Sequence, residues 1–148
     1  MGSHYQGSPE EIRALDAYIK LSRSSEAVES QINAHLKDHA LTTSQFGVLE
    51  ALYHLGSMQT GQLGEKILKS SGNMTLVIDN LVKRGLVRRQ RLEDDRRCVE
   101  VSLTEKGQEL VEIILPAHVE RVVAAFGALT PAEQTQLATL CRKLGLAQ

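Results

Sequence analysis

The sequence predicts a mainly α-helical fold that carries a small two-stranded β hairpin. Three observations lead to this prediction. Between residues 60 and 86, apolar residues recur with helical spacing in two short runs. Residues 86–103 then alternate between apolar and polar side chains around a charged turn, which is typical of a β hairpin. Longer runs with helical spacing precede and follow this central part, over residues 9–38 and 104–146.

The first helix is expected to begin directly after Ser8. Pro9 suits the first position of a helix, and Glu11 completes a capping box with the Ser8 hydroxyl. Apolar residues then continue with helical spacing to Asp38. We therefore expect one long helix over residues 9–38.

Two shorter helices are predicted next. Thr42 and Gln45 form a second capping box, and the helix that follows them is expected to end near Gly56. Thr60 is expected to cap a short third helix.

A fourth helix is predicted to begin at Ser70 or Ser71. Its inward stripe is formed by apolar residues at helical spacing, which are Met74, Val77, Ile78 and Leu81. Gly85 stands where a glycine commonly ends a helix.

The hairpin is predicted to pair residues 86–92 with residues 98–103 around a polar turn at 93–97. Side chains alternate along a strand, so Arg89 and Arg91 share one face and Arg88 lies on the other. These three arginines cannot all face the same partner. At least one of them is expected to be structural and to pair with an acidic residue.

The C-terminal part is predicted to be helical from Thr104 onward, with a last helix that begins at the capping box of Thr130 and Glu133. The helices at both ends of the chain are more apolar than a small central unit can cover. Pairing of two subunits through residues 9–38 and 104–146 explains this best. The alternative is that these helices fold back on their own domain.

Charge is distributed unevenly along the chain. The formal net charge is −1, but the segment from Lys83 to Arg97 contains seven basic residues and only three acidic ones. A local positive excess on an otherwise acidic chain is expected of a phosphate-binding face. The alternative is an ordinary solvated run of charges.

The sequence also argues against several classes of protein. No apolar run approaches the roughly 20 residues of a membrane span, and the N-terminus lacks the features of a signal peptide. Cys98 and Cys141 show no metal-type spacing and are expected to be reduced thiols of a cytoplasmic protein. No catalytic or cofactor-binding motif is visible, so we expect neither an enzyme nor a cofactor.

Three strings of the sequence together resemble the MarR family of bacterial transcriptional regulators. They are LTTSQFGVLEAL, SSGNMTLVIDNLVKRGLVRR and DDRRCVEVSLTEKG. The last contains an Asp-x-Arg motif at Asp95 and Arg97, followed by the Leu-Thr-x-x-Gly pattern of Leu103, Thr104 and Gly107.

The resemblance covers nearly all of residues 1–148 and implies a winged helix-turn-helix. Residues 42–103 would form the DNA-binding unit with a two-stranded wing, and residues 9–38 and 104–146 would be long dimerisation helices. It implies a homodimeric regulator, of the repressor type, on double-stranded DNA with a roughly palindromic operator. A small ligand or cysteine oxidation would release it. The string SGNMTLVIDNL is similar to a subgroup that includes regulators of responses to quinones and aromatic compounds, which favours an aromatic effector.

The fourth helix is the expected recognition helix. Residues off its apolar stripe and near its N-terminus would reach base edges, and the serines that precede it suit a phosphate. The expected DNA contacts on and around this helix are Ser70, Ser71, Asn73, Thr75, Leu76, Asn80, Lys83 and Arg84. The alternative for the serines is that they only cap the helix. Asp79 is expected to make no favourable contact there and only to repel DNA.

In the wing, Arg97 is the expected minor-groove residue. Asp95 would orient it through a salt bridge, because a carboxylate gains nothing from facing DNA. Arg96 is expected to contact a phosphate.

The resemblance places an effector site between the dimerisation helices and the DNA-binding unit. The aromatic and imidazole side chains that could line it are Tyr18, His35, His39, Phe46 and Tyr53. Ordinary core packing explains these residues equally well. His35 and His39 have the spacing of a metal-binding pair, but no carboxylate–histidine cluster accompanies them, so no metal site is predicted.

Two further interpretations stay open. Cys98 follows several arginines, which would favour a thiolate, so a repressor that responds to oxidation is one alternative. Winged helices can also serve as protein-interaction modules that do not bind DNA. A mobility shift with random duplex DNA separates that interpretation from ours, since a docking module would show no salt-sensitive binding.

Overall fold

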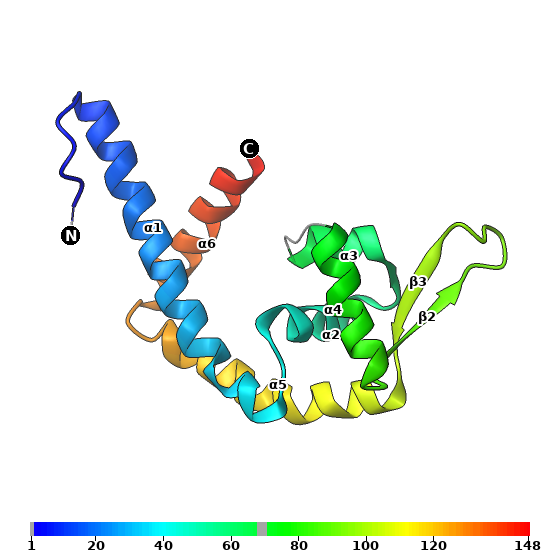
Figure 1. Cartoon of the computed structure of the whole chain (residues 1–148). Helices are drawn as coiled ribbons and strands as arrows, with labels where there is room; N and C mark the ends of the chain where they lie inside the picture. Colours follow the sequence, from blue (N-terminus) through cyan, green and yellow to red (C-terminus); the bar gives the residue numbers. More distant parts are fainter. Residues whose placement is uncertain (1, 68–70) are drawn as a thin grey trace. The chain divides into compact units, whose positions relative to one another are not determined.

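The computed structural model describes residues 2–67 and 71–148 (Figure 1). Its elements follow in the order α1 (Pro9–Asn33), the 3-10 helix η1 (Ala34–His39), α2 (Thr43–Leu55), β1 (Met58–Gln59), α3 (Thr60–Ile67), α4 (Ser71–Lys83), β2 (Val87–Arg91), β3 (Val99–Leu103), α5 (Glu105–Ala125) and α6 (Pro131–Leu146). The predicted class, mainly helical with a small β wing, is confirmed.

The chain divides into two compact units. The first unit comprises Met1–Ala34 and His118–Gln148, and the second unit comprises His35–Ala117. The division falls inside α5, so this helix contributes residues to both units.

The hydrophobic core lies in the second unit. Every buried apolar side chain of the described residues falls between positions 36 and 114. Those excluded from solvent most completely are Leu36, Leu49, Leu63, Met74, Ile78, Leu81, Leu86, Ile114, Val48, Val101 and Val111. The predicted stripe of α4 is confirmed, because Met74, Ile78 and Leu81 are fully buried and Val77 packs against them.

The helix starts follow the local sequence closely. All three predicted capping boxes are present, at Ser8, Thr42 and Thr130, with both reciprocal hydrogen bonds in each. The predicted single helix over 9–38 is wrong in its last residues, since α1 ends at Asn33 and the chain continues as the tighter η1. Thr60 is the first residue of α3 rather than its cap.

The end of α4 is a Schellman motif. Gly85 adopts a φ of 71°, which glycine reaches without steric cost. The Gly85 amide donates to the carbonyl of Val82 at 2.9 Å, and the Leu86 amide donates to that of Leu81 at 3.0 Å. These two bonds satisfy carbonyls that the helix leaves open and confirm the predicted C-terminal glycine.

The wing sheet has three antiparallel strands in the order β1-β3-β2, where the sequence predicted two. The predicted pair β2–β3 is confirmed, with Val87 opposite Leu103 and Arg91 opposite Val99. The added strand β1 contains only two residues, and it places Met58 opposite Val101. Figure 1 shows β2 and β3 as a two-stranded hairpin that extends away from α4.

The passage from β3 into α5 is held by Thr104. Its hydroxyl accepts a hydrogen bond from the Gly107 amide at 3.1 Å and donates one to the carbonyl of Gly85 at 2.6 Å. The Thr104 amide donates to the carbonyl of Leu86 at 3.1 Å. Gly107 lies so close to this carbonyl that a Cβ there would stand 2.0 Å from the Leu86 oxygen. The start of α5 is therefore fixed directly against the end of α4.

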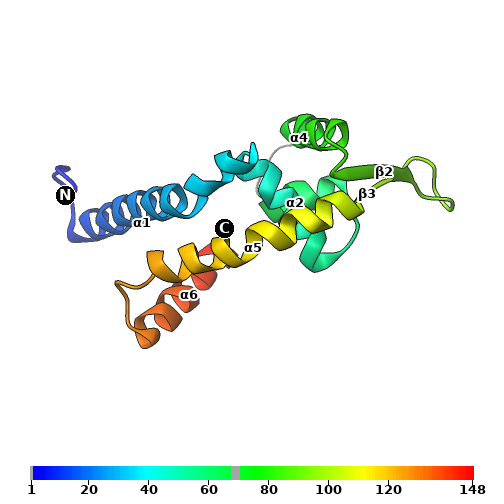
Figure 2. The same ribbon diagram turned by 90° about the horizontal axis from the view of Figure 1, so that it is seen from below.

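The first unit differs from the second in burial, because none of the residues of α1 and α6 is buried. Its large exposed apolar side chains are Tyr5, Ile12, Tyr18, Leu21, Val119, Val123, Leu137, Leu140, Leu144 and Leu146. Within this unit, Arg121 of α5 donates to the carbonyl of Gln31 of α1 at 3.3 Å. Over the described residues, no helix is both long enough and apolar enough to cross a bilayer. Figure 2 shows the same helices from below.

Candidate nucleic-acid interface

The exposed face of α4 presents a polar stripe. Asn73, Leu76, Asn80 and Lys83 recur at intervals of three or four residues, which places them on one side of the helix. Leu76 is 62% exposed although it is a large apolar residue. An exposed leucine within a polar stripe suits contact with a thymine methyl group.

The N-terminal side of α4 is only partly described. Ser70 lies outside the described residues, and Ser71 is the first residue of the helix. Thr75 lies in the first turns of the helix with its side chain exposed. The expected phosphate contacts of the two serines stay predictions.

The structure gives Asp79 a partner, so the expectation that it only repels is wrong. Its Oδ1 forms an ion pair with Nη1 of Arg89 at 2.5 Å. The same guanidinium lies 3.4 Å from the carbonyl of Thr75. Arg89 therefore joins β2 to α4 and neutralises the acidic group of the recognition helix. This confirms that at least one of the three strand arginines is structural.

Arg84 is also engaged within the protein. It follows α4, and its guanidinium donates to the carbonyl of Ala40 at 2.6 Å and to that of His39 at 3.1 Å. Lys83 beside it is exposed. The sequence predicts a DNA contact for both residues. In the structure, Arg84 binds backbone carbonyls of the protein, whereas Lys83 faces solvent.

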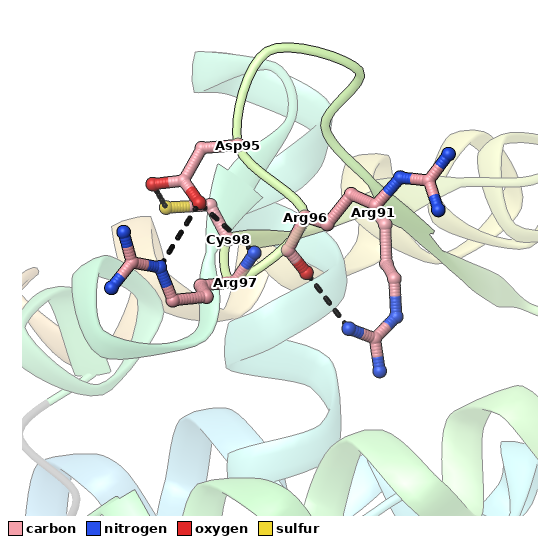
Figure 3. Close-up of polar contacts among 5 residues, drawn as sticks. All are labelled: Arg91, Asp95, Arg96, Arg97 and Cys98. Atoms are coloured by element: carbon pink, nitrogen blue, oxygen red, sulfur yellow. Dashed lines mark hydrogen bonds and ion pairs between the residues drawn. The ribbon is translucent and has the colours of Figure 1, made fainter.

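The wing tip contains the predicted Asp95–Arg97 pair (Figure 3). Nε of Arg97 lies 3.6 Å from Oδ1 of Asp95, and the Arg97 amide donates to the same oxygen at 3.0 Å. The Arg97 side chain is nevertheless 95% exposed. Asp95 thus shapes the turn through its bond to the backbone, while the guanidinium that it pairs with stays exposed to solvent.

A second contact closes the turn from the other strand. Nη1 of Arg91 donates to the carbonyl of Arg96 at 2.8 Å, and Figure 3 shows the Arg96 side chain pointing away from that contact. The loop is therefore held on both sides, by Asp95 and by Arg91. Arg96 is exposed, as a phosphate contact requires.

The environment of Cys98 differs from the expected one. Its thiol lies 3.6 Å from Oδ2 of Asp95 (Figure 3). Desolvation, together with the charge and the hydrogen bond of this carboxylate, raises the pKa of the Cys98 thiol above its usual value. The premise that nearby arginines favour a thiolate is wrong, because the charge that shifts the pKa of this thiol is the negative charge of Asp95. A raised pKa makes the thiol a weaker nucleophile at neutral pH.

The five residues proposed for an effector site do not share one unit. Tyr18 belongs to the first unit, where it lines a pocket with residues of the N-terminal segment and of α1. Tyr53 belongs to the second unit and lines a separate pocket at the end of α2 and the base of β3. Phe46 and His35 are buried, and the rings of His35 and His39 meet edge to face at 6.5 Å between centroids. A shared ligand cleft stays a prediction.

Potential metal ligands are not clustered in the described part of the chain. No group of three or more histidine, cysteine, aspartate or glutamate side chains is arranged there to hold an ion.

A recognition helix that ends against a basic, three-stranded wing defines the chain as a winged helix-turn-helix protein. The sequence profile of the MarR family matches residues 41–99. The chain is 38% identical to the HTH-type transcriptional regulator YkoM of Bacillus subtilis, over 90% of this chain and 87% of YkoM. It is 34% identical to the HTH-type transcriptional regulator MhqR of Bacillus subtilis, over 90% of this chain and 92% of MhqR. The chain belongs to the MarR family of transcriptional regulators.

A solved structure shows the same architecture. BpsR of Bordetella bronchiseptica, whose DNA binding is regulated by 6-hydroxynicotinic acid, superposes with a TM-score of 0.80 at 29% identity, over 87% of this chain and 98% of that one. The family and these relatives are DNA-binding transcriptional regulators and not enzymes.

Proposed function

We propose that the protein is a homodimeric repressor that binds a roughly palindromic operator and is released by a small aromatic ligand. The observation that carries this proposal is the pairing of an exposed polar stripe on α4 with the exposed Arg97 at the wing tip. The stripe would lie in a major groove, with Asn73, Thr75, Leu76 and Asn80 at base edges, and Arg97 would enter the adjacent minor groove.

Dimerisation is supported by the first unit. Two helices without a buried residue gain little from burial within their own chain. Their exposed apolar side chains, most of which are leucines, and the exposed Val119 and Val123 of α5 are the surface that a second copy would cover, because association removes such groups from water. Two copies related by a two-fold axis would present two recognition helices to successive major grooves.

The first prediction concerns the operator complex. Footprinting on the operator is expected to show two symmetric half-sites with centres about 34 Å apart. If each subunit contacts three phosphates, affinity should fall on the order of 1,000-fold between 50 and 200 mM salt. As a control, the free protein at micromolar concentration should sediment at twice its chain mass of 16.3 kDa. A single protected half-site, or a folded monomer, would contradict the dimeric arrangement.

The second prediction concerns the effector. MhqR and BpsR are relatives, and 6-hydroxynicotinic acid, which regulates DNA binding by BpsR, is a hydroxylated aromatic acid. We expect a compound of this class to release a preformed operator complex at concentrations at which a non-aromatic acid of equal charge does not. A screen of phenols, quinones and aromatic acids measures the release. If no aromatic compound acts, while peroxide does and Cys98→Ser abolishes its effect, control by oxidation replaces control by ligand.

A further inference from the structure

The guanidinium of Arg84, which follows α4, binds the C-terminal end of η1. At the end of η1, Ala40 adopts a left-handed φ of 53°. Its amide donates to the carbonyl of Lys37 at 3.0 Å, and the Leu41 amide donates to that of Leu36 at 3.1 Å. This is again the Schellman pattern, here with alanine in the position that glycine usually takes. Those two bonds leave the carbonyls of His39 and Ala40 open, and they are the two that Arg84 binds.

The C-terminal end of α4 also contacts the start of α5. The carbonyl of Arg84 accepts a hydrogen bond from Nζ of Lys106 at 3.0 Å. The next two carbonyls, of Gly85 and Leu86, accept from Thr104. The C-terminus of α4 is therefore attached both to the turn between η1 and α2 and to the first turn of α5, beside which it lies in Figure 1.

The chemistry of the side chain fits this contact. A guanidinium is a planar fork with five N–H donors, so it can bond two neighbouring carbonyls at once. A lysine carries the same charge on a single ammonium group, and it cannot reproduce the planar two-point contact. Arg84 is also less exposed than Lys83, which places its head among protein groups rather than in solvent.

We propose that Arg84 is a positioning residue for DNA recognition, which fixes the C-terminal end of α4 against the turn at His39 and Ala40 and is not itself a phosphate contact. This inference rests on the proposed function, since it concerns how the recognition helix is presented to DNA. It replaces the sequence-based expectation that Arg84 binds DNA.

The test compares Arg84→Lys, Arg84→Ala and, as a matched control, Lys83→Ala. Operator affinity is measured between 50 and 200 mM salt. Both Arg84 variants should bind more weakly by a similar factor, roughly tenfold, the ratio that corresponds to one charge-assisted hydrogen bond. Their salt dependence should equal that of the wild type. Lys83→Ala should instead flatten the slope by about 0.9 for each phosphate that the protein no longer neutralises.

The opposite pattern would overturn the proposal. If Arg84→Lys binds as the wild type does, while Arg84→Ala binds weakly with a flatter salt slope, then Arg84 is a phosphate ligand. Thermal unfolding of each variant checks that a folded protein is being compared.

Hydrogen exchange gives a readout that does not depend on DNA. The amides of Ala40 and Leu41 should exchange faster in Arg84→Lys than in the wild type, and at the wild-type rate in Lys83→Ala. Unchanged exchange in Arg84→Lys would overturn the inference even if the wild type binds its operator. If these amides exchange faster in Arg84→Lys but the wild type binds no duplex DNA, the contact of Arg84 with the turn is supported and the proposed function is refuted instead.

Discussion

Replacing Gly107 with alanine is expected to destabilise the second unit by about 3 kcal/mol, the upper end of the range for overpacked sites. The added Cβ would stand 2.0 Å from the backbone oxygen of Leu86 and 3.1 Å from a methyl group of Leu103. A backbone carbonyl cannot turn aside as a flexible side chain can. The start of α5 must therefore move, and such a movement strains the bonds of Thr104 to Gly85 and Leu86.

The measurement is urea unfolding of Gly107→Ala against the wild type, with the m-value as a check that both unfold by the same transition. In a parallel thermal melt, the midpoint temperature should fall by roughly 6–12 °C for a chain of this size. Gly61→Ala is the matched control, because Gly61 lies in α3 with open space around its Cβ position. Alanine there should be neutral or stabilise by up to about 1 kcal/mol. A wild-type midpoint for Gly107→Ala would show that this helix junction yields freely.

The second large effect is expected at the wing tip. Arg97→Ala should weaken operator binding by about 1–3 kcal/mol, the scale of one specific contact. The exposed guanidinium gains from the negative potential of a narrow, A·T-rich minor groove. Binding of the variant to operator duplex, compared with its binding to duplex of random sequence, measures how much of this loss is specific.

Substitutions of Asp95 and Asp94 test whether Asp95 orients Arg97. Asp95→Ala should also weaken binding, although it removes a negative charge near DNA, because the Asp95 carboxylate accepts a hydrogen bond from the Arg97 backbone and forms an ion pair with its side chain. Asp94→Ala is the matched control, since it removes an equal charge from the adjacent exposed position. Simple attraction to phosphate predicts tighter binding for both variants. Tighter binding of a folded Asp95→Ala would mean that the wing is only a non-specific basic patch.

Features with a local cause could be predicted from the sequence. The boxes at Ser8, Thr42 and Thr130 and the glycine at position 85 act on backbone groups within a few residues. The hairpin likewise depends on alternation along two neighbouring segments. The strand β1 could not be found in this way, because two residues carry no periodicity and their pairing with β3 is a long-range contact.

The roles of the charged residues depended on distant partners. The pairing of Asp79 with Arg89 joins a helix to a strand, and Arg84 reaches a turn more than forty positions earlier in the chain. Cys98 shows the same limit at short range, because counting arginines gave the wrong sign for its pKa shift. The folded turn brings the Asp95 carboxylate to 3.6 Å from the thiol, and this carboxylate raises the pKa of the thiol. Composition thus located the basic segment, and only the fold showed which of its members bind groups of the protein itself.

Because α1 and α6 contain no buried residue, the stability of the proposed dimer should depend on the concentration of the protein. Where association supplies the burial that these helices lack, folding of the first unit becomes a bimolecular step, and its stability rises with the amount of protein present. Newly made chains at low copy number would then carry a folded second unit before a folded first one. Proteases would meet unprotected segments in that state, so that the level of the regulator would set its lifetime as well as the occupancy of its operator.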